Sequence, residues 1–559
     1  MIIDVILSYN LILFKYLMFY AYFYTFGKFV FIKILKFTNE KNHISKLLYI
    51  KKETLYPLLG IVFMGNLLII YNFFSPLKHS GVLIGILFVL SLSSFKKSKL
   101  EFKKLIKFEN LFSYLIIPGI LIISTFDTAY NFDAGYYSIP NQNWLRESNL
   151  IIGTVNLYWE LGMLSITEYI SAVLWFDSSF VLLHLLNVYF IHFFYLTLKE
   201  FIFNKFDQSL KNVSLFLLVF SLFDNFGFGG GRNGYIYIEG VTKQDVPVGI
   251  LFWFLSLVIL KKINEKSIED YEILIISLIS FFVYEIKVSS VFILLWYSFF
   301  LLFLIKIKLY SFKKILYLNL PVLLFSISWF TKSLLTTGCF VYPLDITCLS
   351  VFDWYVDGST LGYELLAKSQ SQPYDFSLSF NQWVLQTGSF EVRKQVFLNF
   401  SISLFLLLLI KLLFFNLKKP KKMVFIISLI YISLNLSYLF LYGPIARYFV
   451  GICLFIVSAV GLSSGDLKIR IPRLNFYILI FFSVFLLVKS SSYLALISNN
   501  ELRIFDPRLS EQIEYVSISS NWVKPQAENL QCWANIKCIP EGEGVIFKKS
   551  GIFKTAFRP

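Results

Sequence analysis

Charged side chains are scarce in this chain, and their scarcity limits what kind of protein it can be. Only 15% of its 559 residues are charged, whereas 57% are hydrophobic and the mean hydropathy is +0.67. Soluble globular domains carry about 25% charged residues, so a string of several soluble domains is excluded. Runs such as residues 404–410 show no alternation of apolar and polar residues, which argues against a membrane β-barrel.

Histidine and cysteine are also few, with four and five residues. His184 and His192 lie two turns apart on one apolar run, and no third ligand stands nearby. We interpret them as polar residues that face a helix bundle rather than as a metal site. The glycine-rich residues 229–234 fit G-x-G-x-x-G but follow no Rossmann strand. No metal site and no required cofactor is therefore predicted, and Walker, zincin and nucleophile-elbow motifs are absent from the sequence.

Long apolar runs are what the chain has in abundance. A bilayer core takes about 20 helical residues, and its interior favours helices because each backbone group is paired within the segment. We expect an all-α, polytopic transmembrane bundle of about 12–14 spans. Residues 271–305 are barely long enough for two spans, and a tight turn is expected at Glu285 and Lys287. The fourteen candidate spans have centres near Leu13, Met64, Leu87, Ile117, Asn187, Leu218, Leu257, Leu278, Leu295, Leu324, Leu407, Tyr431, Leu454 and Phe482.

The net charge of +16 would suggest nucleic acid in a soluble protein. Here the lysines gather in short loops between apolar runs, at 96–107, 306–314 and 418–422. Cytoplasmic loops are rich in Lys and Arg, so we expect these loops in the cytoplasm and no nucleic-acid partner. Residues 127–177 hold six acids and one arginine, so they are expected outside, together with 225–246, 332–395, 442–447 and 491–559. The expected location is the bacterial inner membrane.

The chain divides into three parts on this basis. Residues 1–108 form additional N-terminal helices, 109–490 a transmembrane core with outer loops 127–177 and 332–395, and 491–559 an outer tail. Two close cysteine pairs fall in the outer segments, and they suggest disulfides in an oxidising compartment, although free thiols are the alternative. The pairs are Cys339 with Cys348 and Cys532 with Cys538.

Charged residues beside the apolar runs are the candidates for chemistry. Asp127 and Asp133 follow a span directly, where a carboxylate could act as a general base, bind a divalent cation, or cap the short helix expected over 138–146. Lys287 could hold a lipid-linked phosphate, snorkel, or pair with Glu285 or a neighbouring helix. Arg447 suits bidentate phosphate binding or a membrane-edge anchor. Lys332 has the same two interpretations, phosphate binding or a membrane-edge anchor.

Four stretches carry a resemblance to a known family. They read FDAGYYSIPNQNWLRESNLIIGTVNLYWELG from Phe132, TTGCFVYPLDITC at 336–348, GPIARY at 443–448 and QCWANIKCIP at 531–540. The chain resembles a bacterial family of uncharacterised multi-spanning membrane proteins, which is related in layout to the GT-C superfamily of lipid-sugar-dependent glycosyltransferases. The resemblance covers most of the chain after about residue 110.

The resemblance implies a GT-C-like fold and a sugar donor carried on polyprenyl phosphate. Asp133 stands where the family has its acidic base, with Asp127 as the nearest alternative. Two positions depart from the family pattern: Ser138 replaces a histidine, and Glu160 replaces a basic residue. Both departures leave open which substrate this member takes and whether it is active.

Three functions are compatible with these observations. The first is a transferase in which Asp133 acts on a glycan or lipid acceptor, while Arg447, Lys287 and Lys332 hold the donor phosphate, under a cover formed by 332–395 and the tail. The second is a transporter or flippase for a lipid-linked glycan, which usually has repeat symmetry. The third is an envelope polysaccharide polymerase. The acidic residue in the first outer loop favours the transferase.

Overall fold

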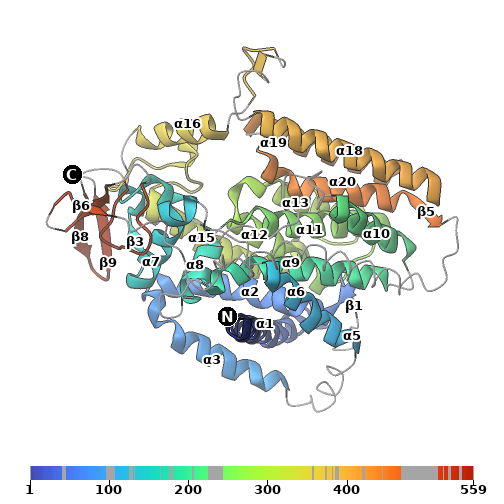
Figure 1. Cartoon of the computed structure of the whole chain (residues 1–559), viewed down its shortest axis with the longest axis horizontal. Coiled ribbons are helices and arrows are strands. Elements are labelled where there is room, and N and C mark those ends of the chain that lie inside the picture. Colours follow the sequence, from blue (N-terminus) through green and yellow to red (C-terminus); the bar gives the residue numbers. More distant parts are fainter. Residues whose placement is uncertain are drawn as a thin grey trace.

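The computed structural model is a helix bundle with a small sheet at one end (Figure 1). It describes residues 2–40, 46–95, 108–124, 130, 132–163, 165–175, 181–203, 207–223, 243–355, 358–371, 374–379, 382–383, 390–417, 422–442, 445–467, 514–519, 521–526, 530–540 and 544–557.

The helices follow the apolar runs of the sequence. They are α1 Ile2–Phe37, α2 Lys52–Asn72, α3 Gly81–Leu92, α5 Phe108–Leu111, α6 Ile117–Ser124, α7 Ile139–Glu147, α8 Ile166–Val173, α9 Val181–Ile202, α10 Gln208–Phe223, α11 Asp245–Glu265, α12 Asp270–Ile286, α13 Phe292–Lys306, α14 Phe312–Leu318, α15 Leu320–Thr337, α16 Ser359–Ser371, α18 Phe390–Phe414, α19 Lys422–Tyr442 and α20 Val450–Leu462. Short helical turns that matter below are the π-helical η3 Phe112–Ile116 and η5 Ala134–Ser138, and the 3-10 turns η7 Trp159–Gly162, η9 Val288–Ser290 and η11 Ala446–Phe449.

The described helices confirm a helical bundle but include fewer spans than expected. Thirteen of the fourteen predicted centres lie in helices, and Phe482 lies outside the described residues. Eight described helices are long and apolar enough to cross a membrane, against the expected 12–14. Several described helices are shorter than a span: α3 has 12 residues, or roughly 18 Å at 1.5 Å per residue, and the described apolar helix around Ile117 covers Phe112–Ile123.

The tight turn expected at Lys287 is confirmed. The α12 helix ends at Ile286, η9 makes a single turn, and α13 begins at Phe292. Ser290 stabilises the reversal because its hydroxyl donates to the carbonyls of Val283 and Lys287, at 2.9 and 2.7 Å. The turn places Lys287 beside the start of α11 rather than in the middle of a span.

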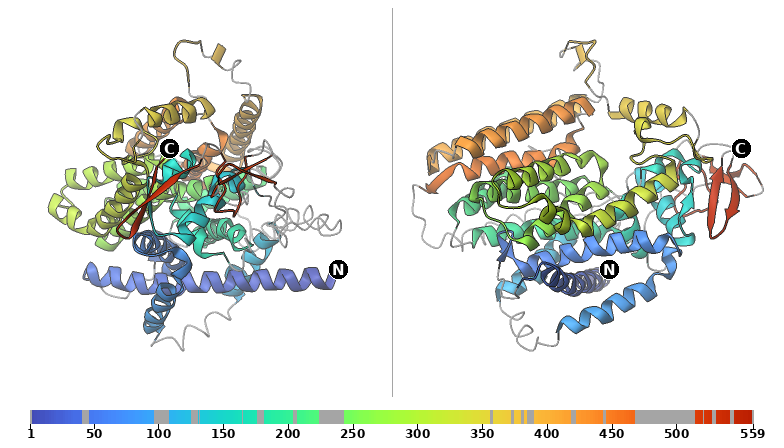
Figure 2. Two further views of the ribbon diagram at one scale, coloured as in Figure 1. Left: turned by 90° about the vertical axis from the view of Figure 1, so that its left-hand side faces the viewer. Right: turned by 180° about the vertical axis from the view of Figure 1, so that it is seen from behind.

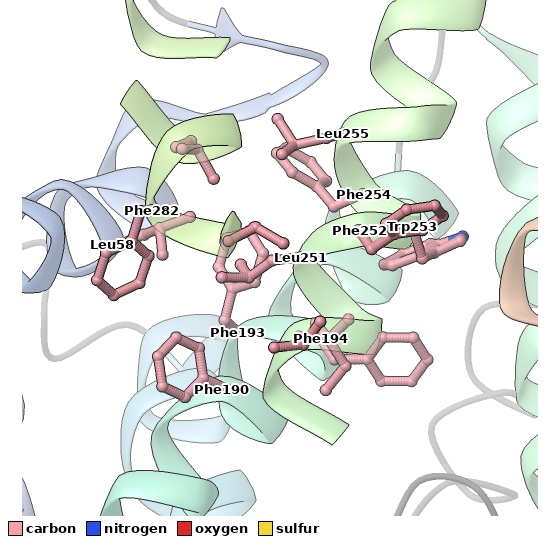
Figure 3. Close-up of a cluster of buried hydrophobic side chains, with 14 of the residues drawn as sticks. Leu58, Phe190, Phe193, Phe194, Leu251, Phe252, Trp253, Phe254, Leu255 and Phe282 are labelled. Atoms are coloured by element: carbon pink, nitrogen blue, oxygen red, sulfur yellow. The ribbon is translucent and has the colours of Figure 1, made fainter. Parts of the chain in front are cut away.

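The centre of the bundle is aromatic. Phe193 and Phe194 of α9 pack edge-on against Phe254 and Trp253 of α11, with ring centroids 5.3 and 5.1 Å apart (Figure 3). Trp253 donates its indole N–H to the hydroxyl of Ser458 of α20 over 2.7 Å. This bond pairs an N–H group for which lipid offers no acceptor. Helices α13, α15, α18 and α19 instead have 22–33% of their apolar windows buried, so most of these residues are partly or fully exposed, as expected of faces that contact lipid.

The helix ends gather at two opposite ends of the bundle. At one end, Tyr49 bonds Glu265, and Tyr310 bonds the carbonyl of Ile268. The antiparallel pairs β1 Lys46–Leu47 with β2 Ile50–Lys51, and β4 Phe415–Leu417 with β5 Ser464–Leu467, also lie there (Figure 1). At the other end lie α7, α8, α16 and the sheet (Figure 2, right). The acid-rich segment and the tail therefore share one end.

A second, smaller hydrophobic core departs from the all-α expectation. It is built around a sheet of order β3-β9-β8, formed by β3 Ile151–Ile152, β9 Phe553–Phe557 and β8 Ile546–Ser550. The hairpin of β6 Tyr515–Ser517 and β7 Val523–Pro525 lies beside it (Figure 1). Its buried side chains come from residues 151–161, 339–342 and 522–556, three segments far apart in the sequence.

The first helix crosses the long axis of the bundle. It is seen nearly end-on in Figure 1 and along its length in the left view of Figure 2. Its crossing with α2 is very close, because Gly27 lies against the Tyr56 carbonyl and Gly60 against the Phe23 carbonyl. Only glycine permits backbones to approach so closely. Both helices also pack onto the remaining bundle: α2 contacts α8, α9, α12 and α15, and α1 contacts α6 and α9.

Candidate functional site

A buried aspartate, Asp245, is the centre of the most highly charged cluster at the sheet end of the bundle. It opens α11, where a negative charge is stabilised by the helix dipole. One carboxylate oxygen forms an ion pair with the Lys287 ammonium, and the other lies 3.3 Å from Nε of Arg447. Lys287 comes from the turn after α12 and Arg447 from η11. Three segments far apart in the sequence therefore meet at one carboxylate.

Tyr448 supports both cations from its ring face. The Lys287 ammonium lies 4.2 Å from the ring centroid, and the Arg447 guanidinium carbon lies 5.7 Å from it. Cation–π contacts at such distances stabilise a positive charge without a second carboxylate. Burial acts to lower the pKa of Lys287, but the Asp245 carboxylate outweighs burial and holds this pKa above its ordinary value. Lys287 is therefore a cation at neutral pH.

Asp133 lies next to this cluster and has a cation of its own. It stands immediately before η5 and forms an ion pair with Lys243, two residues before Asp245. The Tyr137 hydroxyl donates to the same carboxylate oxygen over 3.3 Å. Burial, and then the Asp133 charge, raise the pKa of Tyr137 well above its ordinary value. Tyr137 therefore keeps its hydroxyl proton and donates it to the Asp133 carboxylate.

The Asp245 cluster borders a shallow recess that is open to the surface; its empty space of about 430 Å³ includes the open volume at its mouth. Polar side chains that line the recess are those of Asp245, Lys287, Arg447, Tyr448, Ser289, Ser290 and Asn435. The apolar lining comes from α11, α13, α19 and α20: Val248, Phe252, Phe292, Leu439 and Ile452. A ligand with an anionic head and an apolar tail matches such a surface.

The structure brings together three of the five charged residues that the sequence singled out. Lys287 and Arg447 meet at Asp245, and Asp133 lies beside them, within electrostatic reach of Arg447. Asp127 lies outside the described residues. Lys332 is not at the recess: it is buried in α15, with its ammonium 3.6 Å from the Trp329 ring centroid.

Lys332 has a different acidic neighbour, Glu285 near the end of α12. Glu285 accepts a hydrogen bond from the Asn66 amide over 3.1 Å, and all three residues are buried. The ion pair of Lys287 with Glu285 that the sequence left open is not formed, since Lys287 turns to Asp245 on the neighbouring helix. Two separate polar groups therefore exist near this end of the bundle.

Sequence reasoning missed Lys243 and Asp245. Both precede an apolar run and look like ordinary loop charges. An aspartate at the first residue of a span could have been noticed, because a helix N-terminus stabilises a negative charge. Of the two positions that depart from the family pattern, Ser138 bonds the buried Glu168 carboxylate. Glu160 is buried in η7 and does not border the recess.

The cysteines pair within the sheet end. Disulfides link Cys339 with Cys348 and Cys532 with Cys538, the two pairings that the sequence suggested, and Cys453 is a buried free thiol. Within the described ranges, no three His, Cys, Asp or Glu side chains come together in a group that could hold a metal ion.

The C-terminal tail docks onto the segment that carries Asp133. Strand β9 pairs in parallel with β3, with Ile151 opposite Lys554. The amides of Asn149 and Asn156 donate to the carbonyls of Ile552 and Ala556 over 2.9 and 3.0 Å. The tail therefore packs against the outer segment that follows Asp133.

Comparison with known proteins identifies a family without a known activity. No curated protein and no solved structure matches the chain. Residues 10–454 match the family described as a domain of unknown function, DUF8201. The match includes the first helices, the segment with Asp133 and every residue of the Asp245 cluster, and it ends before the tail. Because it spans most of the sequence, the chain belongs to the DUF8201 family.

Proposed function

We propose that the protein is a membrane glycosyltransferase that takes its sugar from a polyprenyl-phosphate donor during synthesis of a cell-envelope glycan. The observation that carries this proposal is the recess, where two cations and several apolar side chains line one site and the Asp133 carboxylate lies nearby. The proposed setting is the outer side of a bacterial inner membrane, and the GT-C-like layout is part of the proposal.

The donor phosphate would bind at Lys287 and Arg447. Arginine presents a planar fork that matches phosphate oxygens, and lysine adds a compact charge. Asp245 holds both cations in place before the ligand arrives, so little reorganisation is needed on binding. The apolar walls of α11, α13, α19 and α20 would receive the first part of the prenyl chain.

Asp133 would act as the general base. It removes the proton from the acceptor hydroxyl while the acceptor oxygen bonds to the anomeric carbon of the sugar. The bond between that carbon and the phosphate oxygen breaks, and its electron pair leaves with the polyprenyl phosphate. The ion pair with Lys243 would hold the Asp133 carboxylate in place for this step.

The test compares lipid-linked and surface glycans in cells that carry wild type, Asp133→Asn, or a deletion. Asp133→Asn and the deletion should lose the same sugar and accumulate its polyprenyl-phosphate donor. The exposed Asp353→Asn is a matched control that should keep the wild-type profile. A wild-type profile in Asp133→Asn would refute the transferase.

Transport of a lipid-linked glycan is a second candidate, favoured by the buried Lys332 and Glu285. Ionisable residues inside membrane spans often mark a transport path, and these two lie away from the recess. For a transporter, Lys332→Met should trap the lipid-linked glycan on the inner side, whereas Asp133→Asn should not. A polymerase would instead show a changed chain length of the surface polysaccharide.

A further inference from the structure

The C-terminal tail contains a small loop that a disulfide closes beside the Asp133 segment. Cys532 and Cys538 are bonded to each other. Inside the loop, the Asn535 N–H donates to the Cys532 carbonyl and the Cys538 N–H donates to the Asn535 carbonyl, each over 3.1 Å. The loop is thus a compact unit whose ends are held together covalently.

Two backbone hydrogen bonds join this loop to the segment that carries Asp133. The N–H groups of Cys532 and Trp533 both donate to the Gly135 carbonyl, each over 2.9 Å. Gly135 is two residues from Asp133, and a Cβ added to it would lie 2.6 Å from Cε2 of Trp533. Glycine is therefore required here for the close approach of the loop.

Trp533 anchors the loop in the bundle. Unlike its neighbours in the tail, it is buried in the main hydrophobic core rather than in the second one. Its ring lies 5.4 Å from that of Tyr130, which lies 5.2 Å from His184 of α9. A further bond runs from the Asn143 amide to the Ala534 carbonyl over 2.7 Å. The loop therefore contacts the chain on both sides of Asp133.

We propose that the loop 532–538 is a positioning element that holds Asp133 beside Lys243, with Trp533 as its anchor. This inference rests on the proposed function only for the chemical role of Asp133. The family match ends at residue 454, so the positioning element is supplied from outside the matched part of the chain. Because the disulfide closes the loop, an oxidising compartment is required for the complete site.

Hydrogen exchange of the full-length protein in detergent tests the positioning directly. Trp533→Ala, Gly135→Ala and the double variant Cys532→Ser, Cys538→Ser should each raise exchange in residues 132–147 by about tenfold or more, the factor that loss of one or two hydrogen bonds predicts. Exchange in α11 should stay unchanged, which shows that the bundle is intact. The conservative Trp533→Phe should restore most of the protection.

Gly362→Ala is the matched control for Gly135→Ala, because a Cβ at Gly362 meets no atom within 4 Å. It should leave exchange at the wild-type rate. Unchanged exchange over 132–147 in Trp533→Ala and in the cysteine variant would overturn the proposal. Gly135→Ala provides the test if the cysteine variant fails to accumulate.

The glycan profile separates this inference from the proposed function. If loop variants with raised exchange reproduce the profile of Asp133→Asn, the loop acts through Asp133. If exchange rises but Asp133→Asn keeps the wild-type profile, the transferase is refuted and the positioning of the segment stands. If exchange does not rise, the positioning is refuted whatever the glycan profile shows.

Discussion

Replacing Asp245 with asparagine should destabilise the protein through the two cations that it leaves behind. The carboxylate side chain is 2% exposed, whereas those of Lys287 and Arg447 are 27% and 41% exposed. Asparagine keeps the shape of the side chain and removes its charge. The change therefore isolates the electrostatic role of Asp245 from its packing.

Coulomb's law sets the scale of this effect. At the 3.3 Å between Arg447 Nε and the Asp245 oxygen, a unit charge pair at an effective dielectric constant of about 20 is worth roughly 5 kcal/mol. Both cations are partly exposed, so solvent screens much of this value. Buried pairs that lose one partner typically cost about 3–5 kcal/mol. We expect Asp245→Asn to lower the free energy of unfolding by about 2–3 kcal/mol.

Equilibrium unfolding in mixed detergent micelles measures this loss, and a double-mutant cycle assigns its cause. Adding Lys287→Met to Asp245→Asn should recover about 1 kcal/mol, because one unpaired cation is removed. Glu147→Gln is a control in the exposed pair of Lys78 with Glu147 and should cost less than about 1 kcal/mol. If Asp245→Asn unfolds like wild type, or the second substitution adds a further loss, the electrostatic reasoning is wrong.

Two further predictions concern the stability of the bundle and of the segment around the cluster. Burial raises the pKa of Glu168 to about 8 from an ordinary value near 4.5, against the opposing bond from Gln142. The folded state therefore holds this proton more tightly than the unfolded state, so stability should fall as the pH rises from about 4.5 through about 8. Unfolding of Glu168→Gln should give the same stability at pH 5.5 and 8.5. If this variant loses as much stability as wild type between these pH values, the assignment to Glu168 is wrong. Gly27→Ala should cost more than about 2 kcal/mol, because its Cβ would meet the Tyr56 carbonyl, whereas Gly85→Ala, with open space around it, should unfold like wild type.

The sequence by itself determined that the chain forms membrane-type helices and where most of them lie. Long apolar runs require helices in lipid whatever they pack against, so the centres of these runs could be predicted. Charged residues at the ends of such runs are conspicuous, so Asp133, Lys287 and Arg447 are candidates from the sequence alone. Nearby cysteines in one segment likewise suggested their own pairing.

Only the tertiary structure decided which charges meet and how many helices are long enough to cross. The π-helical turn η3, whose Ser113 carbonyl lies 2.7 Å from Nε2 of His192 on α9, is one feature that composition does not reveal. Lys332 and Arg447 look alike in the sequence, but one lies beside Glu285 and the other beside Asp245, because packing of α12, α15 and η11 sets the partners. The tail meets Gly135 across some four hundred residues, and local sequence carries no signal for a contact at that separation.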